Sequence, residues 1–186
     1  MNGSASYPYK IVSDQEWALS TFTEFYDRIL GPRLFRPYGE LLVEEIRKDI
    51  DMTAPPGRIL EVACGTGCIT TSLYENLARP MNIQLTATDL SKIAIDMAQQ
   101  VVSDDLRRNV TFIANVDMAE MPFADNSFDI LVCGFGLMFP PDKARVAREF
   151  RRVLRPGGKI YGTVFHYNEL FSLAQRESHK RFGTPS

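Results

Sequence analysis

The chain has 186 residues, 45% of them hydrophobic, which is enough to bury one core. Its formal net charge is −2 with acidic and basic residues intermixed, so a nucleic-acid partner is not expected. The amino terminus shows no basic segment followed by an apolar one, and the longest apolar run, 130–139, is short and interrupted by glycine. We therefore expect one compact domain without a membrane span.

Three cysteines, Cys64, Cys68 and Cys133, make an odd number, and no histidine stands at metal-ligand spacing from them. We read them as reduced thiols of a cytoplasmic protein and predict no metal site. Cys64 and Cys68 flank a glycine turn that has another explanation, so a redox pair is the weaker interpretation.

Two helices are predicted before the first strand. Apolar residues recur at helical spacing over 14–30, and the Gly-Pro pair at 31–32 is expected to end that helix. A second amphipathic helix is predicted from about residue 34 or 38 to residue 50, ahead of the Pro-Pro-Gly sequence at 55–57. Residues 1–57 are thus expected to form an arm followed by two helices that precede the sheet.

From residue 58 onward, strand patterns and helix patterns alternate. The predicted strands span 58–63, 83–89, 110–115, 128–133 and 159–165, and the predicted helices span 68–78, 92–102 and 141–154. Such alternation requires parallel pairing and right-handed crossovers. We therefore predict an α/β fold in residues 58–165: a doubly wound, Rossmann-like, mostly parallel sheet with helices on both faces. Ligands bind at the carboxyl ends of such strands, here Ala63, Asp89, Asn115 and Cys133.

The most informative segment is RILEVACGTGCIT, residues 58–70. An apolar strand leads into Gly65 and Gly67, which permit a tight turn and close approach of a ligand to the backbone. Asp89 ends the second strand, where a carboxylate can accept hydrogen bonds from both hydroxyls of a ribose. Together these features predict a site for a ribose-bearing cofactor. The structural alternatives are a plain tight turn at the glycines and a helix-capping role for Asp89.

The details of the turn argue against a dinucleotide, because Thr70 stands where the NAD fingerprint has its third glycine. Residues 61–67 instead resemble the acidic-x-Gly-x-Gly-x-Gly motif of class I S-adenosylmethionine-dependent methyltransferases, with Ala63 in place of the first glycine. Further segments follow in the order typical of small-molecule methyltransferases related to the ubiquinone and menaquinone biosynthesis enzymes. They are ATDLS at 87–91, Asp117 followed by MPF at 121–123, NSFDI at 126–130 and RVLRPGG at 152–158.

This resemblance implies S-adenosyl-L-methionine as cofactor, S-adenosyl-L-homocysteine as product, and a small, fairly apolar methyl acceptor whose reacting atom (O, C or N) is left open. In the family, the acidic residue at the position of Asp117 binds the adenine amino group; a plain loop aspartate is the alternative here. The cofactor-binding residues implied are Glu61, Ala63, Cys64, Gly65, Gly67, Asp89, Leu90, Asp117, Met118, Cys133, Gly134 and Tyr26.

The implied chemistry needs alignment of donor and acceptor and exclusion of water, because the methyl donor is already activated. A base helps where the acceptor is a phenol or hydroxyl, whereas positioning suffices for an enol or an electron-rich ring carbon. The resemblance also implies that the helices within residues 1–57 form a cofactor lid and a wall of the acceptor site. His166, just past the last predicted strand, is the candidate catalytic residue, with a surface or packing role as its alternative. The candidates for lining the acceptor site, with core packing as their alternative, are Tyr7, Tyr26, Phe135 and Phe139.

Three other features are given structural interpretations. Asp129 lies inside the fourth predicted strand, and the segment 155–158 is expected to be a helix stop and turn without chemistry. The arginines at 145–155 are expected to form a solvated helix face.

Members of the family close the sheet with a further helix and two further strands, whereas only 21 residues follow residue 165. Strands six and seven are therefore expected to be missing, with residues 166–186 forming a helix or tail. The fifth strand would then be an exposed edge unless the last helix, the second copy in a homodimer or a partner chain covers it. The alternative function is a methyltransferase-like protein that binds S-adenosylmethionine without methylating, as a partner or regulatory subunit or a non-methylating catalyst.

Overall fold

The computed structural model describes residues 26–51 and 55–164, without the side chains of residues 26–28. The predictions for residues 1–25 and 165–186 lie outside this range. They include the first part of the amino-terminal helix, the candidate catalytic residue His166 and the carboxyl-terminal helix.

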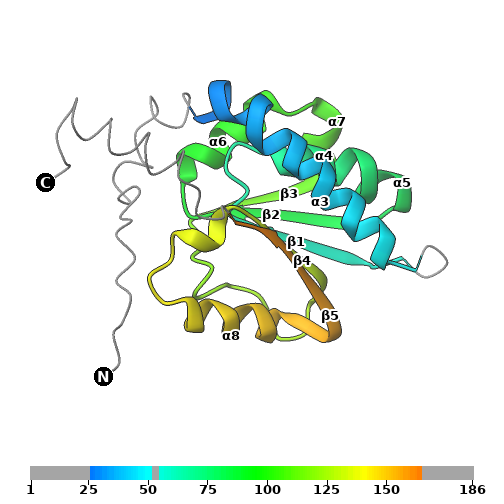
Figure 1. The fold of residues 1–186 in the computed structure, drawn as a ribbon, viewed down its shortest axis with the longest axis vertical. Helices are drawn as coiled ribbons and strands as arrows, with labels where there is room; N and C mark the ends of the chain where they lie inside the picture. Colours follow the sequence, from blue (N-terminus) through cyan, green and yellow to red (C-terminus); the bar gives the residue numbers. More distant parts are fainter. Residues whose placement is uncertain (1–25, 52–54, 165–186) are drawn as a thin grey trace, which may run out of the picture.

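Five parallel strands form one sheet in the order β3-β2-β1-β4-β5 (Figure 1). They are β1 (Arg58–Val62), β2 (Gln84–Asp89), β3 (Val110–Ala114), β4 (Phe128–Gly134) and β5 (Leu154–Thr163). The inner strands are apolar on both faces, as parallel strands covered by helices must be; Ile59 and Leu60 are each 0% exposed. The predicted doubly wound parallel sheet is confirmed. The chain reverses direction across the sheet between β1 and β4, and a crevice at the carboxyl ends of these two strands is the expected ligand position.

Helices cover both faces of the sheet, as predicted (Figure 1). One face carries α3 (Arg36–Asp49), α4 (Cys68–Leu73), η2 (Tyr74–Ala78), α5 (Arg79–Met81), α6 (Lys92–Val101) and α7 (Asp104–Asn109). The other face carries α8 (Lys143–Val153), whose Val146, Phe150 and Val153 pack beneath β1 and β4. Among the described residues, no helix is long and apolar enough to cross a membrane.

Two helical features differ from the predictions. The π-helix η1 (Tyr26–Phe35) contains Gly31 and Pro32, so the prediction that this pair ends the helix is wrong. A proline ring in an α-helix contacts the carbonyl four residues earlier, and the wider π turn relieves that contact. The helix α7 was not predicted because six residues are too few for a periodic signal. Ser103 caps it through a 3.3 Å hydrogen bond from Leu106 N to Ser103 Oγ.

Strand β5 begins earlier than predicted, directly after α8 ends at Val153. The helix stop is confirmed, but the expected turn at 155–158 is part of the strand. A register shift against β4 accommodates it, and Gly157 supplies a φ of +81°. Further along, Gly162 lies so close to β4 that an added Cβ would be 2.9 Å from the Cys133 carbonyl oxygen.

Within the described residues, β5 pairs only with β4 and so forms one edge of the sheet. Ile160 on this strand is 51% exposed. The strand is held to α3 by hydrogen bonds from Tyr161 Oη to Asp49 Oδ2 (2.9 Å) and from Lys159 Nζ to the Asp49 carbonyl (3.0 Å). Cover of this edge by a second copy or a partner chain stays a prediction.

Asp129, near the start of β4, contacts the amino-terminal ends of β1 and β5, in keeping with its expected structural role. Its Oδ2 accepts a 2.6 Å hydrogen bond from the backbone N–H of Arg58, and its Oδ1 pairs with Arg155 at 2.6 Å. The interaction lies at the end of the sheet where β1 begins, so it takes no part in a ligand site at the carboxyl ends.

Arg152 on α8 holds the long connection between β3 and β4 in place. Its guanidinium donates to the carbonyls of Met121 and Phe123 (2.9 and 2.6 Å), to Asp125 (2.9 Å) and twice to Glu149 (2.8 Å each). Glu149 Oε2 also accepts a 2.9 Å hydrogen bond from Met121 N, and the Arg152 guanidinium lowers the pKa of Glu149 to about 2. Arg152 is therefore an anchor, and the prediction of a solvated face is wrong for this residue.

We expect Arg152→Ala to lower the free energy of unfolding by about 2 kcal/mol, because it removes hydrogen bonds to charged groups and leaves backbone carbonyls unpaired. Arg148→Ala on the exposed side of the same helix is the matched control and should change it by less than about 0.5 kcal/mol. Urea denaturation followed by circular dichroism measures both. Equal midpoints for the two variants would contradict the anchoring role.

Candidate functional site

The turn after β1 is built from residues in the left-handed region. Ala63, Gly65 and Gly67 have φ values of 55°, 56° and 85°. Hydrogen bonds of 3.0 Å from Gly67 N to the Cys64 carbonyl and from Cys64 N to the Thr88 carbonyl close the turn. A Cβ added at Gly65 would meet nothing within 4 Å, so one side of this backbone is open. The structure thus shows the sharp, open turn that the sequence predicts.

Ala63, which replaces the first glycine of the motif, has a spatial partner that sequence reasoning missed. A left-handed conformation costs an alanine roughly 1–2 kcal/mol. Gly136, which begins η3 (Gly136–Met138), lies against it: a Cβ added there would be 2.4 Å from the Ala63 Cβ. The methyl group of Ala63 is therefore accommodated because position 136 has no side chain. No spacing rule in the sequence connects these two positions.

Asp89 is held rigidly at the carboxyl end of β2. Its Oδ2 accepts a hydrogen bond from Gly65 N and its Oδ1 one from Ser91 N, both at 2.8 Å. Burial raises the pKa of Asp89, and these N–H donors oppose that shift. The cap of α6 is Ser91, whose Oγ accepts a 3.2 Å hydrogen bond from Ala94 N, so the capping alternative for Asp89 is wrong. The carboxylate instead joins the glycine turn to β2.

Glu61 lies beneath the turn on β1 and is 1% exposed. Burial raises its pKa to about 8; the nearby Thr70 hydroxyl opposes this shift and the Asp89 carboxylate adds to it. Even so, Glu61 Oε2 and Thr70 Oγ1 have no hydrogen-bond partner among the described residues. Two unpaired buried polar atoms at one place are uncommon in a folded core. Thr70, which the sequence marks only as the absent third glycine, is thus part of the site.

The β4 side of the site is apolar. Burial raises the pKa of the Cys133 thiol to about 12 and also raises that of Cys64, so both stay neutral. Ile69 covers Gly134, since a Cβ added at Gly134 would be 2.1 Å from Ile69 Cδ1. Phe135 then turns with a φ of 60° into an aromatic cluster.

This aromatic cluster consists of Phe35, Tyr38 and Phe135. The Phe135 ring centroid lies 5.4 Å from that of Phe35 and 5.8 Å from that of Tyr38. Phe135 is buried, whereas Tyr38 is 47% exposed. The cluster brings α3 and the end of β4 together beside the glycine turn.

Apart from Tyr26, the remaining predicted residues follow the carboxyl ends of the strands. Leu90 is 53% exposed, and Asp117 is exposed with its Oδ1 accepting a 2.8 Å hydrogen bond from Ala119 N. A 3.1 Å hydrogen bond from Val116 N to the Asp89 carbonyl ties the Asp117 loop to the end of β2, and Met118 packs beneath it. The backbone of Tyr26 begins η1, but its side chain lies outside the described residues.

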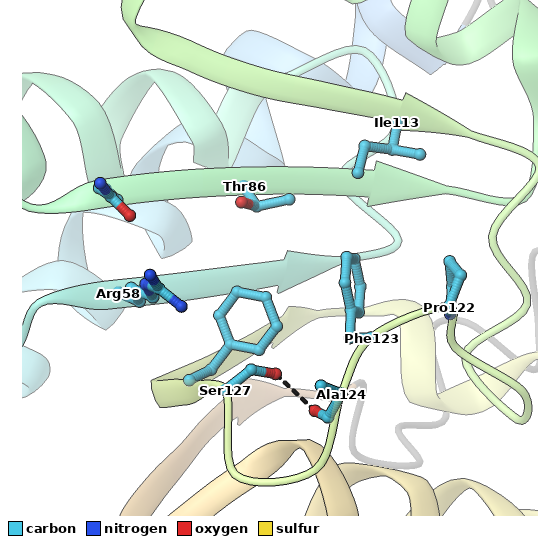
Figure 2. Close-up of a pocket in the computed structure, with 9 residues that line it drawn as sticks. Arg58, Thr86, Ile113, Pro122, Phe123, Ala124 and Ser127 are labelled. Atoms are coloured by element: carbon cyan, nitrogen blue, oxygen red, sulfur yellow. Dashed lines mark hydrogen bonds between the residues drawn. The ribbon is translucent and has the colours of Figure 1, made fainter.

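A cavity of about 300 Å³ lies elsewhere, on the sheet face that carries α8 (Figure 2). Its floor is β1 and β2, and its wall is the connection before β4, where the rings of Phe123 and Phe128 meet edge to face at 5.1 Å. None of the predicted cofactor-binding residues lines it. The cavity is therefore separate from the site at the carboxyl ends of the strands.

Comparisons with known proteins agree with this geometry. Residues 59–158, more than half of the chain, match the family model described as a methyltransferase domain. The chain therefore belongs to the methyltransferase domain family, and its Rossmann-like core is the fold of class I methyltransferases.

Individual relatives carry related names. The chain is 29% identical over 137 residues to the ubiquinone/menaquinone biosynthesis C-methyltransferase of Geotalea daltonii, covering 74% of this chain and 55% of that protein. It is 33% identical over 154 residues to the demethylmenaquinone methyltransferase of Lactococcus lactis, covering 80% and 59%. The chain thus spans little more than half the length of these relatives.

Among solved structures, the fold is similar to that of phosphoethanolamine N-methyltransferase 2 from Haemonchus contortus. The TM-score is 0.68 at 22% identity, over 91% of this chain and 41% of that one. At this identity the likeness concerns the fold alone.

The buried Glu61 predicts how the stability of the ligand-free chain depends on pH. Its pKa of about 8 when folded exceeds the ordinary value of 4.5, so the folded state holds the proton more tightly. The stability it contributes is complete below pH 4.5 and is lost as the pH rises through 8. We expect the free energy of unfolding to fall between pH 5 and pH 8 more steeply in the wild type than in Glu61→Gln. Denaturant titrations at several pH values measure this difference, and parallel curves would contradict it.

Proposed function

We propose that the chain binds S-adenosylmethionine at the carboxyl ends of β1, β2 and β4 and transfers its methyl group to a small, fairly apolar acceptor. The observation that carries this proposal is the Asp89 carboxylate, held by the Gly65 N–H beside an open glycine turn. Membership of the methyltransferase domain family supports it.

The residues present fit this cofactor. Each Asp89 oxygen uses one lone pair on a backbone N–H and keeps another for a ribose hydroxyl, which is a donor. The open backbone at Gly65 admits a ligand. Asp117, with Met118 beside it, is assigned to the adenine amino group, and Leu90 is a further proposed cofactor contact next to Asp89. Glu61 provides a buried carboxyl group beneath the turn, suited to a ligand of positive charge.

When bound, S-adenosylmethionine supplies a methyl group whose bond to sulfur breaks as a bond to the acceptor atom forms, leaving S-adenosylhomocysteine. The role of the chain is to orient the methyl donor and the acceptor and to exclude water. Asp89 and the glycine turn hold the ribose end, while Ile69 and the aromatic cluster keep the β4 side apolar. A base at His166, which would take the proton that a phenol or hydroxyl acceptor loses, remains part of the proposal.

The acceptor is proposed as a small metabolite with an aromatic or quinone-like ring. Two relatives carry names from ubiquinone and menaquinone biosynthesis, and the exposed ring of Tyr38 in the aromatic cluster offers a surface on which a planar ring packs. The reacting atom stays open. A cytoplasmic setting, and cover of the β5 edge by a second copy or a partner chain, belong to the same proposal.

We expect Asp89→Ala and Gly65→Arg each to abolish binding of S-adenosylmethionine and S-adenosylhomocysteine. The first removes the acceptor for the ribose hydroxyls, and the second fills the open side of the turn. Isothermal titration calorimetry measures the affinities, and circular dichroism confirms that each variant is folded. Asp104→Ala, an exposed aspartate at the start of α7, is the matched control and should bind like the wild type.

Unchanged affinity in both site variants would contradict the assignment of the pocket. An assay of methyl transfer from labelled S-adenosylmethionine to demethylmenaquinone-like quinols distinguishes an enzyme from a non-methylating binder, because only the enzyme labels the acceptor. Binding without transfer to any acceptor would favour the binder.

A further inference from the structure

We propose that Glu61 carries a proton in the ligand-free chain and releases it to solvent when the positively charged S-adenosylmethionine binds beside it. The O–H bond of the carboxylic acid breaks, the proton passes to buffer, and the carboxylate remains to balance the charge of the bound cofactor. This inference rests on the proposed function, and it adds a regulatory property, sensitivity of cofactor affinity to pH.

The first support is the burial of the carboxyl group and the lack of a partner for one of its oxygens. Glu61 is 1% exposed, and its Oε2 has no hydrogen-bond partner among the described residues. An ionised carboxylate without a partner is costly in such a place, so the neutral acid is the stable form until a cation arrives. Thr70 Oγ1, also unpaired, stands nearby and can turn its hydroxyl toward whichever form is present.

The groups that face Glu61 also favour its neutral, protonated form. The turn contributes Cys64, β4 contributes Cys133, and the end of β2 contributes Asp89. Both thiols remain neutral, because burial raises their pKa values. Asp89 adds negative charge, and no described lysine or arginine forms an ion pair with Glu61. Within the described part of the chain, Glu61 therefore has no cationic partner, and in this proposal the ligand supplies one.

The position links this carboxyl group to ligand binding. Glu61 is two residues before the first left-handed position of the turn, and Asp89, which binds the turn through Gly65 N, is close enough to raise the pKa of Glu61. A cation held at this turn lies within range of the buried carboxyl group, and in a low-dielectric site that attraction is strong. Binding and loss of the proton are then linked, and affinity rises with pH.

The test is calorimetric titration of the full chain with S-adenosylmethionine at pH 6, 7 and 8, each in buffers with different ionisation enthalpies. We expect roughly 0.5 to 1 proton released per cofactor at pH 7, and an affinity that rises about tenfold or more from pH 6 to pH 8. In Glu61→Gln, an isosteric side chain that cannot ionise, both effects should disappear. Difference infrared spectroscopy of the wild type, with labelled glutamate, observes the protonated carboxyl directly and does not depend on the variant folding.

Each outcome is decisive. Proton release that is lost in Glu61→Gln supports the inference. Binding with no proton release and equal affinity at pH 6 and pH 8 overturns it and leaves the proposed cofactor site standing. Absence of a protonated carboxyl band in the ligand-free chain at pH 7 overturns it also. No binding by the folded chain at any pH overturns the proposed function, and this inference with it.

Discussion

The site depends on one hydrogen bond, from the Gly65 N–H to the Asp89 carboxylate. It joins the turn after β1 to the end of β2, two places that the chain separates by 24 residues. A second bond, from Ser91 N, fixes the other oxygen and couples the carboxylate to the start of α6. Because both donors are backbone groups, the geometry of the carboxylate is set by the main chain of the glycine turn and of the start of α6, and not by mobile side chains.

Burial at this junction has two opposite effects. It strengthens the bonds that orient Asp89, since hydrogen bonds to a charged group gain in a low-dielectric setting. It also leaves Glu61 and Thr70 with unpaired polar atoms, at a cost in stability that an apolar pair would avoid. Such a cost at the carboxyl ends of the strands is typical of a ligand site and supports the proposed function. Structural burial and a functional role are thus compatible for Glu61.

The parallel sheet and the glycine turn could be predicted from the sequence because residues close together in the chain determine both. Strand periodicity identified β1, β2 and β4, and the spacing of Gly65, Gly67 and Asp89 identified the turn. Local pattern failed where a distant contact decides the outcome. Arg152 was read as part of a solvated face, yet its partners lie in the connection before β4, 27 to 31 residues away. Pro32 was read as a helix end, but a π turn accommodates it.

Ala63 shows how a departure from a family motif is balanced within the structure. Taken alone, alanine at the first glycine position weakens the motif, because its methyl group makes the left-handed φ of 55° at this position costly. The methyl group occupies space that a side chain at position 136 would need, and that residue is glycine. A small residue is therefore required in the segment after β4, at the position that directly follows Phe135 of the aromatic cluster. A motif is better judged by the volume that its residues leave open than by the letters at its positions.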